Sequence, residues 1–152
     1  MRRTNPAGAR AQVVGVYSPG LVRRIAEVLA LLGARRAFVV HGAYGIDELS
    51  PAGPNLVCEV RDGEVTERTL DPLDLGIERC TPDELRGGGA EQNAAALRGV
   101  LGAVLLNAAG AIAAAGHAED LREGLELARR AVDSGAALER LDELARYSQE
   151  DA

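Results

Sequence analysis

The order of apolar and polar residues in the first forty positions predicts a strand, a helix and a second strand. Residues 12–17 (QVVGVY) form a short β-branched run, and residues 37–40 (AFVV) are apolar without interruption, as in a fully buried strand. Between these runs, Ser18 and Pro19 suit the cap and the first position of a helix. The apolar positions that follow recur at helical spacing: Leu21, Val22, Ile25, Val28, Leu29 and Leu32. This strand–helix–strand unit predicts two parallel strands joined by a right-handed crossover.

The next stretch has the pattern of a β-hairpin. Residues 56–61 and 64–70 are strand-like, and Asp62-Gly63 between them is a strong signal for a two-residue turn. Apolar and polar residues alternate in both runs. We therefore expect a half-exposed antiparallel pair at an edge of the sheet.

The remainder of the chain is predominantly helical. Asp71-Pro72 and Thr81-Pro82 each place a capping residue before a proline, and Glu84 completes a capping box. Helices are predicted over residues 91–101, 103–115, 120–133 and 136–146, the second of them apolar on nearly all sides and therefore buried. Because the first two meet at Leu101-Gly102 with no loop between them, these helices either merge or turn abruptly there.

Together these elements predict an α/β fold: a partial parallel sheet from a βαβ unit, an antiparallel edge hairpin, and a cover of C-terminal helices. At 152 residues the chain has the length of a single domain. We expect residues 1–70 to be strand-rich, residues 71–147 to be helical, and residues 148–152 to form a disordered tail.

Composition and charge exclude several classes of function. The net charge is −6 and aromatic residues make up 3%, which argues against a nucleic-acid-binding surface of basic patches and stacking rings. All 17 basic residues are arginine, so Schiff-base catalysis and a phosphate loop with its lysine are excluded. No signal peptide is recognisable, and the longest apolar stretch, residues 103–116, is too short to span a bilayer. We expect a cytoplasmic protein without nucleic-acid or membrane partners, and with two free thiols.

The candidate chemistry lies in residues 41–48 (HGAYGIDE), directly after the buried strand. In open parallel sheets, ligands gather at the carboxyl ends of the strands, where this loop is expected. Gly42 and Gly45 allow tight backbone turns, and the adjacent carboxylates of Asp47 and Glu48 can coordinate Mg²⁺ together with waters and substrate phosphates. Adjacent acidic residues are also common on solvated loops, so the residues alone leave the role of the pair open.

Other polar residues are expected to be structural. His41 ends the buried strand and is interpreted as packed and hydrogen-bonded, and Asn107 on the apolar helix as satisfying a neighbouring backbone group. Cys58 is interpreted as a small packed residue, and Ser18 as a helix cap. Residues 87–89 (GGG) are interpreted as a flexible linker.

Several segments resemble one enzyme family. The run VVHGAYGIDELSPAGPN (residues 39–55) resembles the His-Gly-x-x-Gly-x-Asp-Glu segment of anthranilate phosphoribosyltransferase. The similarity begins at TNPAG (residues 4–8) and continues through LDPLDLGI, LRGGGAEQNAAALRGVL, AVLLNAAGAI and LREGLELARRAVDSG, so that it covers nearly the whole chain.

This resemblance implies a function and a site. The family transfers a phosphoribosyl group from phosphoribosyl pyrophosphate (PRPP) to the amino nitrogen of anthranilate in tryptophan biosynthesis. It implies that Asp47 and Glu48 hold the Mg²⁺ that accompanies the pyrophosphate, and that Asn5 and Gly42 contribute to substrate binding. No catalytic residue is assigned.

The sequence departs from the family in what it lacks. The family's Gly-Thr-Gly-Gly-Asp phosphate loop, its Asn-x-Ser and Lys-His-Gly-Asn-Arg segments and its N-terminal helical domain all belong upstream of Thr4. We therefore expect a truncated, C-terminal portion of the α/β domain that is inactive alone and forms homo-oligomers through the surface left by the missing half. The alternatives are a non-enzymatic scaffold or self-associating module that keeps only the architecture, and a small-molecule binder at residues 45–48.

Overall fold

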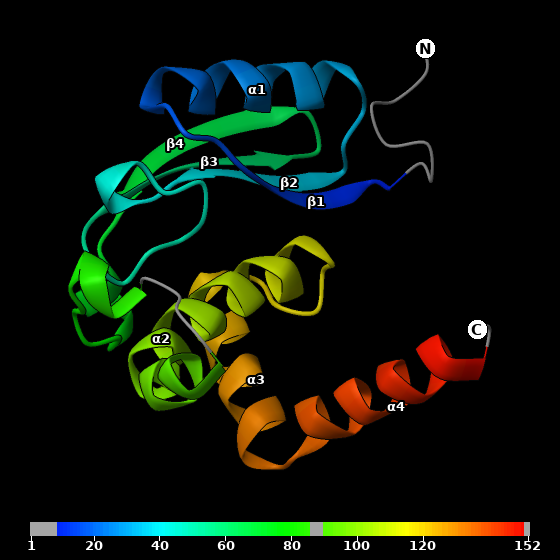
Figure 1. Cartoon of the computed structure of the whole chain (residues 1–152). Coiled ribbons are helices and arrows are strands. Elements are labelled where there is room, and N and C mark those ends of the chain that lie inside the picture. Colours follow the sequence, from blue (N-terminus) through cyan, green and yellow to red (C-terminus); the bar gives the residue numbers. More distant parts are fainter. Residues whose placement is uncertain (1–8, 86–89, 151–152) are drawn as a thin grey trace.

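The computed structural model describes residues 9–85 and 90–150 of the chain (Figure 1). The first half contains β1 (Ala11–Gly15), α1 (Pro19–Leu31), β2 (Arg36–His41), β3 (Asn55–Arg61) and β4 (Glu64–Leu70). The second half contains α2 (Ala90–Ala114), α3 (Leu121–Asp133) and α4 (Ala136–Glu150). Short 3-10 turns occur at Ala43–Gly45, Pro72–Leu75 and Pro82–Leu85. The α/β class and the order of elements are as predicted.

The four strands form one sheet in the order β1-β2-β3-β4. β1 and β2 are parallel, with Ala11 opposite Arg36, and α1 makes the crossover between them. β3 is antiparallel to both β2 and β4. At the β3–β4 turn, Asp62 (φ 49°) and Gly63 (φ 91°) both have positive φ, the conformation of a tight hairpin turn. The predicted βαβ unit and edge hairpin are confirmed. The expectation that both hairpin strands are half-exposed is wrong for β3, which is mostly buried because it lies between β2 and β4, whereas β4 at the edge is largely exposed.

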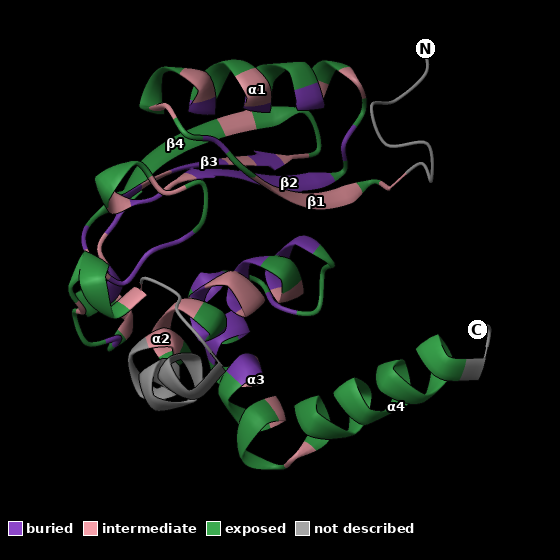
Figure 2. Cartoon of the chain, in the orientation of Figure 1, coloured by how far each residue is buried: buried purple, intermediate pink, exposed green. Residues whose placement is uncertain are grey.

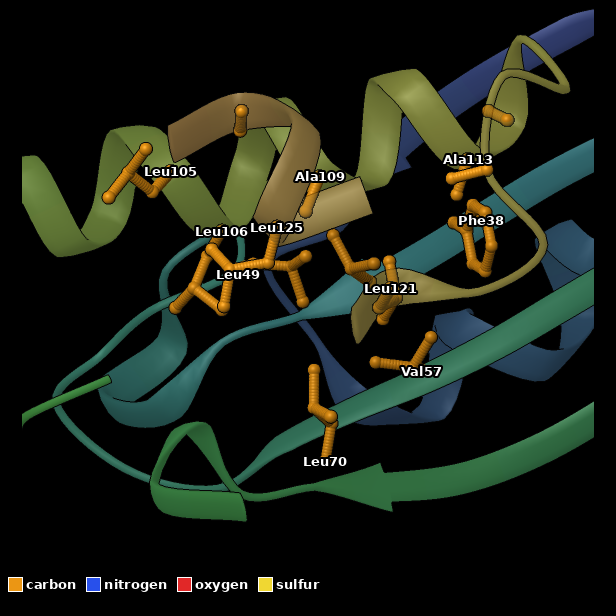
Figure 3. Packing of buried hydrophobic residues seen from close by; sticks show 14 of the residues in the cluster. Phe38, Leu49, Val57, Leu70, Leu105, Leu106, Ala109, Ala113, Leu121 and Leu125 are labelled. Carbon is orange, nitrogen blue, oxygen red and sulfur yellow. The ribbon is translucent and has the colours of Figure 1, made fainter. Parts of the chain in front are cut away.

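The sheet is covered on both faces, so its inner strand β2 has no exposed side (Figures 1 and 2). In β2, Ala37 and Val39 join a cluster with α1, whereas Phe38 and Val40 join a second cluster with α2 and α3. Figure 3 shows part of this second cluster, which also includes Leu106 from α2. Burial on both faces explains why β2 is an uninterrupted apolar run in the sequence.

The helical half differs from expectation in two places. The predicted helices at 91–101 and 103–115 merge into α2, because one glycine costs a helix only about 1 kcal/mol and α2 is anchored by buried residues beyond Gly102. α4 continues to Glu150, so residues 148–150, which were expected to belong to a disordered tail, are helical. The predictions for Asn5 and for residues 87–89 lie outside the described residues.

The start of α1 is predicted correctly, but its cap is not. Pro19 occupies the first turn, whereas the Ser18 side chain makes no capping hydrogen bond. The Ser18 carbonyl instead accepts a hydrogen bond from the Leu21 N–H at 3.1 Å. Among the described residues, no helix is both long and apolar enough to cross a membrane.

A buried arginine ties the amino end of β2 to the α2–α3 connection. Arg36 is 7% exposed, and its guanidinium lies 3.0 Å from the Glu59 carboxylate. It also donates to the carbonyl oxygens of Ala118 at 2.8 Å and Glu119 at 2.6 Å. These contacts hold the helical layer at this end of the sheet.

Replacing this arginine tests the connection. The change Arg36→Met removes the hydrogen bonds to Glu59, Ala118 and Glu119, and it leaves the buried Ala118 carbonyl without this donor, whereas the Glu119 carbonyl keeps its hydrogen bond from Arg61. We therefore expect a loss of about 2–3 kcal/mol in the free energy of unfolding. Urea denaturation followed by circular dichroism measures it. Arg23→Met is the control, because the Arg23–Glu27 pair is exposed and its loss costs less than about 0.5 kcal/mol. Equal effects of the two changes would contradict the assignment.

Candidate functional site

The loop that carries the acidic pair leaves the sheet at the carboxyl ends of the two parallel strands. β1 ends at Gly15 and β2 at His41, and His41 Nδ1 lies 2.8 Å from the carbonyl oxygen of Val16. This contact joins the two strand ends and confirms the structural interpretation of His41. The loop therefore lies where it was predicted, at the carboxyl end of a parallel pair of strands, which is where α/β proteins bind ligands.

The loop turns tightly before it reaches the acidic pair. The Gly42 N–H donates to the Ile46 carbonyl at 2.7 Å and so closes the turn. Gly45 has φ +80°, as a glycine in a tight turn can, but Tyr44 also has a positive φ of 63°. A tyrosine in this conformation is strained, and its side chain is exposed. This conformation of Tyr44 was not predicted from the sequence.

Two glycines form a backbone seat for the acidic pair. A Cβ atom on Gly15 would lie 1.5 Å from the carbonyl oxygen of Asp47, and one on Gly42 would lie 2.2 Å from that of Glu48. Only glycine permits such contacts at either position. Gly42 has an ordinary φ of −82°, so its role is close approach and not the turn geometry expected for it. Gly15 was missed, although a glycine within a β-branched strand is itself a signal of close backbone approach.

The backbone after the acidic pair is held by two asparagine side chains. Asn107 on α2 pairs with the main chain of Leu49, and Asn55 at the start of β3 pairs with the main chain of Ser50. The prediction that Asn107 satisfies a neighbouring backbone group is confirmed. The role of Asn55, which is fully buried, was not predicted.

The side chains of Asp47 and Glu48 are exposed to solvent, in contrast to the backbone that supports them. In the described part of the chain, no three His, Cys, Asp or Glu side chains gather closely enough to hold a metal ion by themselves. Two carboxylates fit Mg²⁺ well, because Mg²⁺ usually takes one or two protein carboxylates and completes its coordination with waters and substrate phosphates. The same two groups do not fit a metal that requires a closed protein cage.

A small, mainly apolar cavity of about 240 Å³ lies beside the pair. Its walls include Glu48 and Leu49 from the loop and Leu85 and Ala103 from the helical half. A larger hollow of about 530 Å³ lies at the opposite end of β2, next to Arg36. The acidic pair therefore lies at the other end of β2 from this larger hollow.

Neither cysteine is suited to act as a nucleophile. Cys58 is buried, and this burial, together with the neighbouring Glu67 carboxylate, raises the pKa of its thiol to about 11. Burial also raises the pKa of Cys80. Both remain thiols at neutral pH, which supports the interpretation of Cys58 as a packed residue.

This fold and site define a class of protein. The chain matches the model of the glycosyl transferase family α/β domain over residues 4–138, and it belongs to that family.

Within this family, the chain is similar to several anthranilate phosphoribosyltransferases. The chain is 50% identical to an anthranilate phosphoribosyltransferase of Pelotomaculum thermopropionicum, over 95% of this chain and 44% of the relative. It is 54% identical to one of Thermomicrobium roseum, over 92% of this chain and 43% of the relative. The chain thus spans less than half the length of these proteins. The resemblance found in the sequence is confirmed.

Solved structures agree with this relationship. Anthranilate phosphoribosyltransferase from Saccharomyces cerevisiae in complex with PRPP and Mg matches with a TM-score of 0.71 and 26% identity, over 87% of this chain and 41% of that one. The complex of the same enzyme with 4-fluoroanthranilate matches equally well, with a TM-score of 0.71. The metal and the ligands belong to those structures.

The backbone seat can be tested by adding one methyl group. Gly15→Ala forces a Cβ against the Asp47 carbonyl, so we expect a loss of about 1–3 kcal/mol in the free energy of unfolding and amide chemical-shift changes over residues 42–49. Gly20→Ala is the matched control, since a Cβ there meets nothing within 4 Å, and it should be neutral or slightly stabilising. Chemical denaturation and two-dimensional NMR measure both. A Gly15→Ala protein as stable as wild type would refute the seat.

Proposed function

We propose that this chain is the portion of an anthranilate phosphoribosyltransferase that binds the Mg²⁺–pyrophosphate group of PRPP, and that it has no transferase activity alone. In the reaction, the amino nitrogen of anthranilate bonds to C1 of the ribose while the bond from C1 to the pyrophosphate oxygen breaks. Pyrophosphate and the proton displaced from the amine are released. Mg²⁺, when bound, stabilises the negative charge that develops on the pyrophosphate.

The observation that carries this proposal is the acidic pair on a fixed backbone. Asp47 and Glu48 present two solvent-facing carboxylates at the carboxyl end of β2, and their carbonyl groups rest on Gly15 and Gly42. A metal ligand must be held in place before the metal arrives, and a fixed main chain provides this. The membership of the family and the yeast complex with PRPP and Mg support the same assignment.

The residues assigned to substrate by resemblance are Gly42 and Asn5. The Gly42 N–H already donates to the Ile46 carbonyl, and the Glu48 carbonyl fills the space beside its Cα, so Gly42 acts on a ligand through the path of the acidic loop. Asn5 lies outside the described residues, and its assignment rests on the TNPAG segment alone.

The expected inactivity of the isolated chain follows from its missing phosphate-binding motifs. Its sequence contains no Gly-Thr-Gly-Gly-Asp, Asn-x-Ser or Lys-His-Gly-Asn-Arg segment. Preorganised hydrogen-bond donors and substrate positioning supply much of the rate of a group transfer. A pair of carboxylates that binds a metal does not replace them.

The double change Asp47→Ala, Glu48→Ala tests the metal site. We expect it to weaken the binding of Mg²⁺–pyrophosphate at least tenfold by isothermal titration calorimetry, on the order of 1.4 kcal/mol or more, and to leave the unfolding free energy nearly unchanged because both side chains are exposed. The control Glu126→Ala, Asp133→Ala removes the same charge from exposed positions on α3 and should leave the affinity unaltered. Equal affinities for wild type and the double variant would refute the metal site.

A fluorescence assay of anthranilate consumption with PRPP and Mg²⁺ tests the expected inactivity of the chain. We expect no consumption by well-folded protein. Consumption that disappears in the Asp47→Ala, Glu48→Ala variant would mean that the chain assembles a complete site alone.

A second candidate function is self-association, which two exposed features favour. Within the described residues β1 pairs only with β2, so its outer edge is unpaired. On α4, Leu138, Leu141 and Leu144 are 60–64% exposed, and their spacing of three residues places them along one face of the helix. Unpaired edges and apolar helix faces are surfaces through which copies of a chain associate.

Light scattering tests self-association through α4. We expect wild type at high micromolar concentration to have a mass above the 15.9 kDa of one chain, and the charge-neutral double change Leu141→Arg, Leu144→Glu to shift it toward that value. The exchange Glu139→Arg, Arg146→Glu on the same helix is the control and should leave the mass unchanged. A wild-type protein that is strictly monomeric would refute this candidate.

A further inference from the structure

Two side-chain amides hold consecutive residues directly after the acidic pair. Asn107 binds the main chain of Leu49 from α2, and Asn55 binds the main chain of Ser50 from β3. The two contacts differ in range. Asn55 is five residues from Ser50 and shapes its own loop, whereas Asn107 is 58 residues from Leu49 and connects the loop to another layer.

The Asn107 side chain has one orientation that satisfies all its partners. Its Oδ1 accepts from the Leu49 N–H at 3.0 Å, and its Nδ2 donates to the Leu49 carbonyl at 2.8 Å and to the Ala103 carbonyl at 2.9 Å. The reverse orientation would face an amide N–H with an NH₂ group and two carbonyls with an oxygen. The amide thus pairs with Leu49 as a neighbouring strand would, although this part of the loop is not in the sheet.

Asn107 is a half-buried polar residue on an otherwise apolar part of α2. The neighbouring residues Leu105, Leu106 and Ala109 are buried, and a polar side chain among them is costly unless it is hydrogen-bonded. The Leu49 side chain is itself 1% exposed and lies in the cluster with Leu106 (Figure 3). Leu49 is therefore already held by the packing of its side chain, and the hydrogen bonds from Asn107 also fix the orientation of its peptide groups.

We propose that Asn107 is a positioning residue for the acidic pair, an inference that rests on the proposed metal–pyrophosphate function of Asp47 and Glu48. The backbone seat supports the carbonyls of these two residues, and Asn107 fixes the next residue in the chain. The Glu48 backbone is therefore held on both sides. A carboxylate that coordinates a metal needs placement to within about 0.5 Å, and supporting hydrogen bonds of this kind are what provide it.

The test compares Asn107→Leu, which keeps the size of the side chain and removes its three hydrogen bonds, with Ile112→Ala. Ile112 is a partly buried α2 residue packed against the same core. Its aliphatic side chain makes no hydrogen bond, so its truncation lowers stability without removing a hydrogen bond to Leu49. Amide hydrogen exchange by NMR is the first readout. We expect Asn107→Leu to speed exchange at Leu49 and residues 46–48 roughly ten- to a hundredfold more than at β2, and Ile112→Ala to act without this bias.

Binding of Mg²⁺–pyrophosphate by calorimetry is the second readout, with Asp47→Ala, Glu48→Ala as its reference. We expect Asn107→Leu to weaken binding several-fold, and the acidic-pair variant to weaken binding without faster exchange at Leu49. Asn107→Ala removes the same three hydrogen bonds without adding bulk or charge, so it should weaken binding in the same way as Asn107→Leu. It serves as the deciding variant if Asn107→Leu does not fold.

Three results would overturn the proposal. Faster exchange spread evenly over the sheet would show that Asn107 contributes only to stability. Local loosening with unchanged affinity would show that the loop's order does not matter to the metal site, with the proposed function intact. A wild-type chain that binds no Mg²⁺–pyrophosphate would refute the proposed function itself, and the role of Asn107 toward that ligand with it.

Discussion

The burial of β2 on both faces is the constraint on which the rest of the molecule depends. Alternate residues of this strand face α1 and the α2–α3 layer, so the loss of either layer would expose one face of β2 to solvent. β2 also fixes both ends of the domain. Its first residue, Arg36, holds the α2–α3 connection, and its last, His41, contacts the end of β1 where the acidic loop begins. The site is thus positioned by the most buried element of the fold.

Much of this architecture could be predicted because it is local in the sequence. The uninterrupted apolar run of β2, the helical spacing of α1 and the Asp62-Gly63 turn each depend on neighbouring residues, and all three predictions are confirmed. The merging of two helices into α2 and the helical course of residues 148–150 depend on weaker preferences that the sequence pattern leaves undecided.

The candidate site was predicted only in part, for a related reason. The position of Asp47 and Glu48 after a buried strand is a local feature and could be read directly. The contacts that hold them join Gly15 to residue 47 and Asn107 to residue 49, and a spacing pattern contains no information on such distant pairs. A single glycine in a strand and a single asparagine on an apolar helix were the only traces of these contacts in the sequence. The residue types at Gly15 and Asn107 indicated an unusual local environment, but they did not indicate which residues would contact them.

The backbone seat separates the fold of the loop from its chemistry. Gly15 and Gly42 support carbonyl oxygens, which every amino acid possesses, and they make no demand on the side chains at positions 47 and 48. Those two positions can therefore change during evolution, or in the hands of an engineer, without a change in the path of the chain. A scaffold of this kind can exchange carboxylates for imidazoles or amides and so acquire a preference for a different ion, while its folding remains under the control of residues elsewhere.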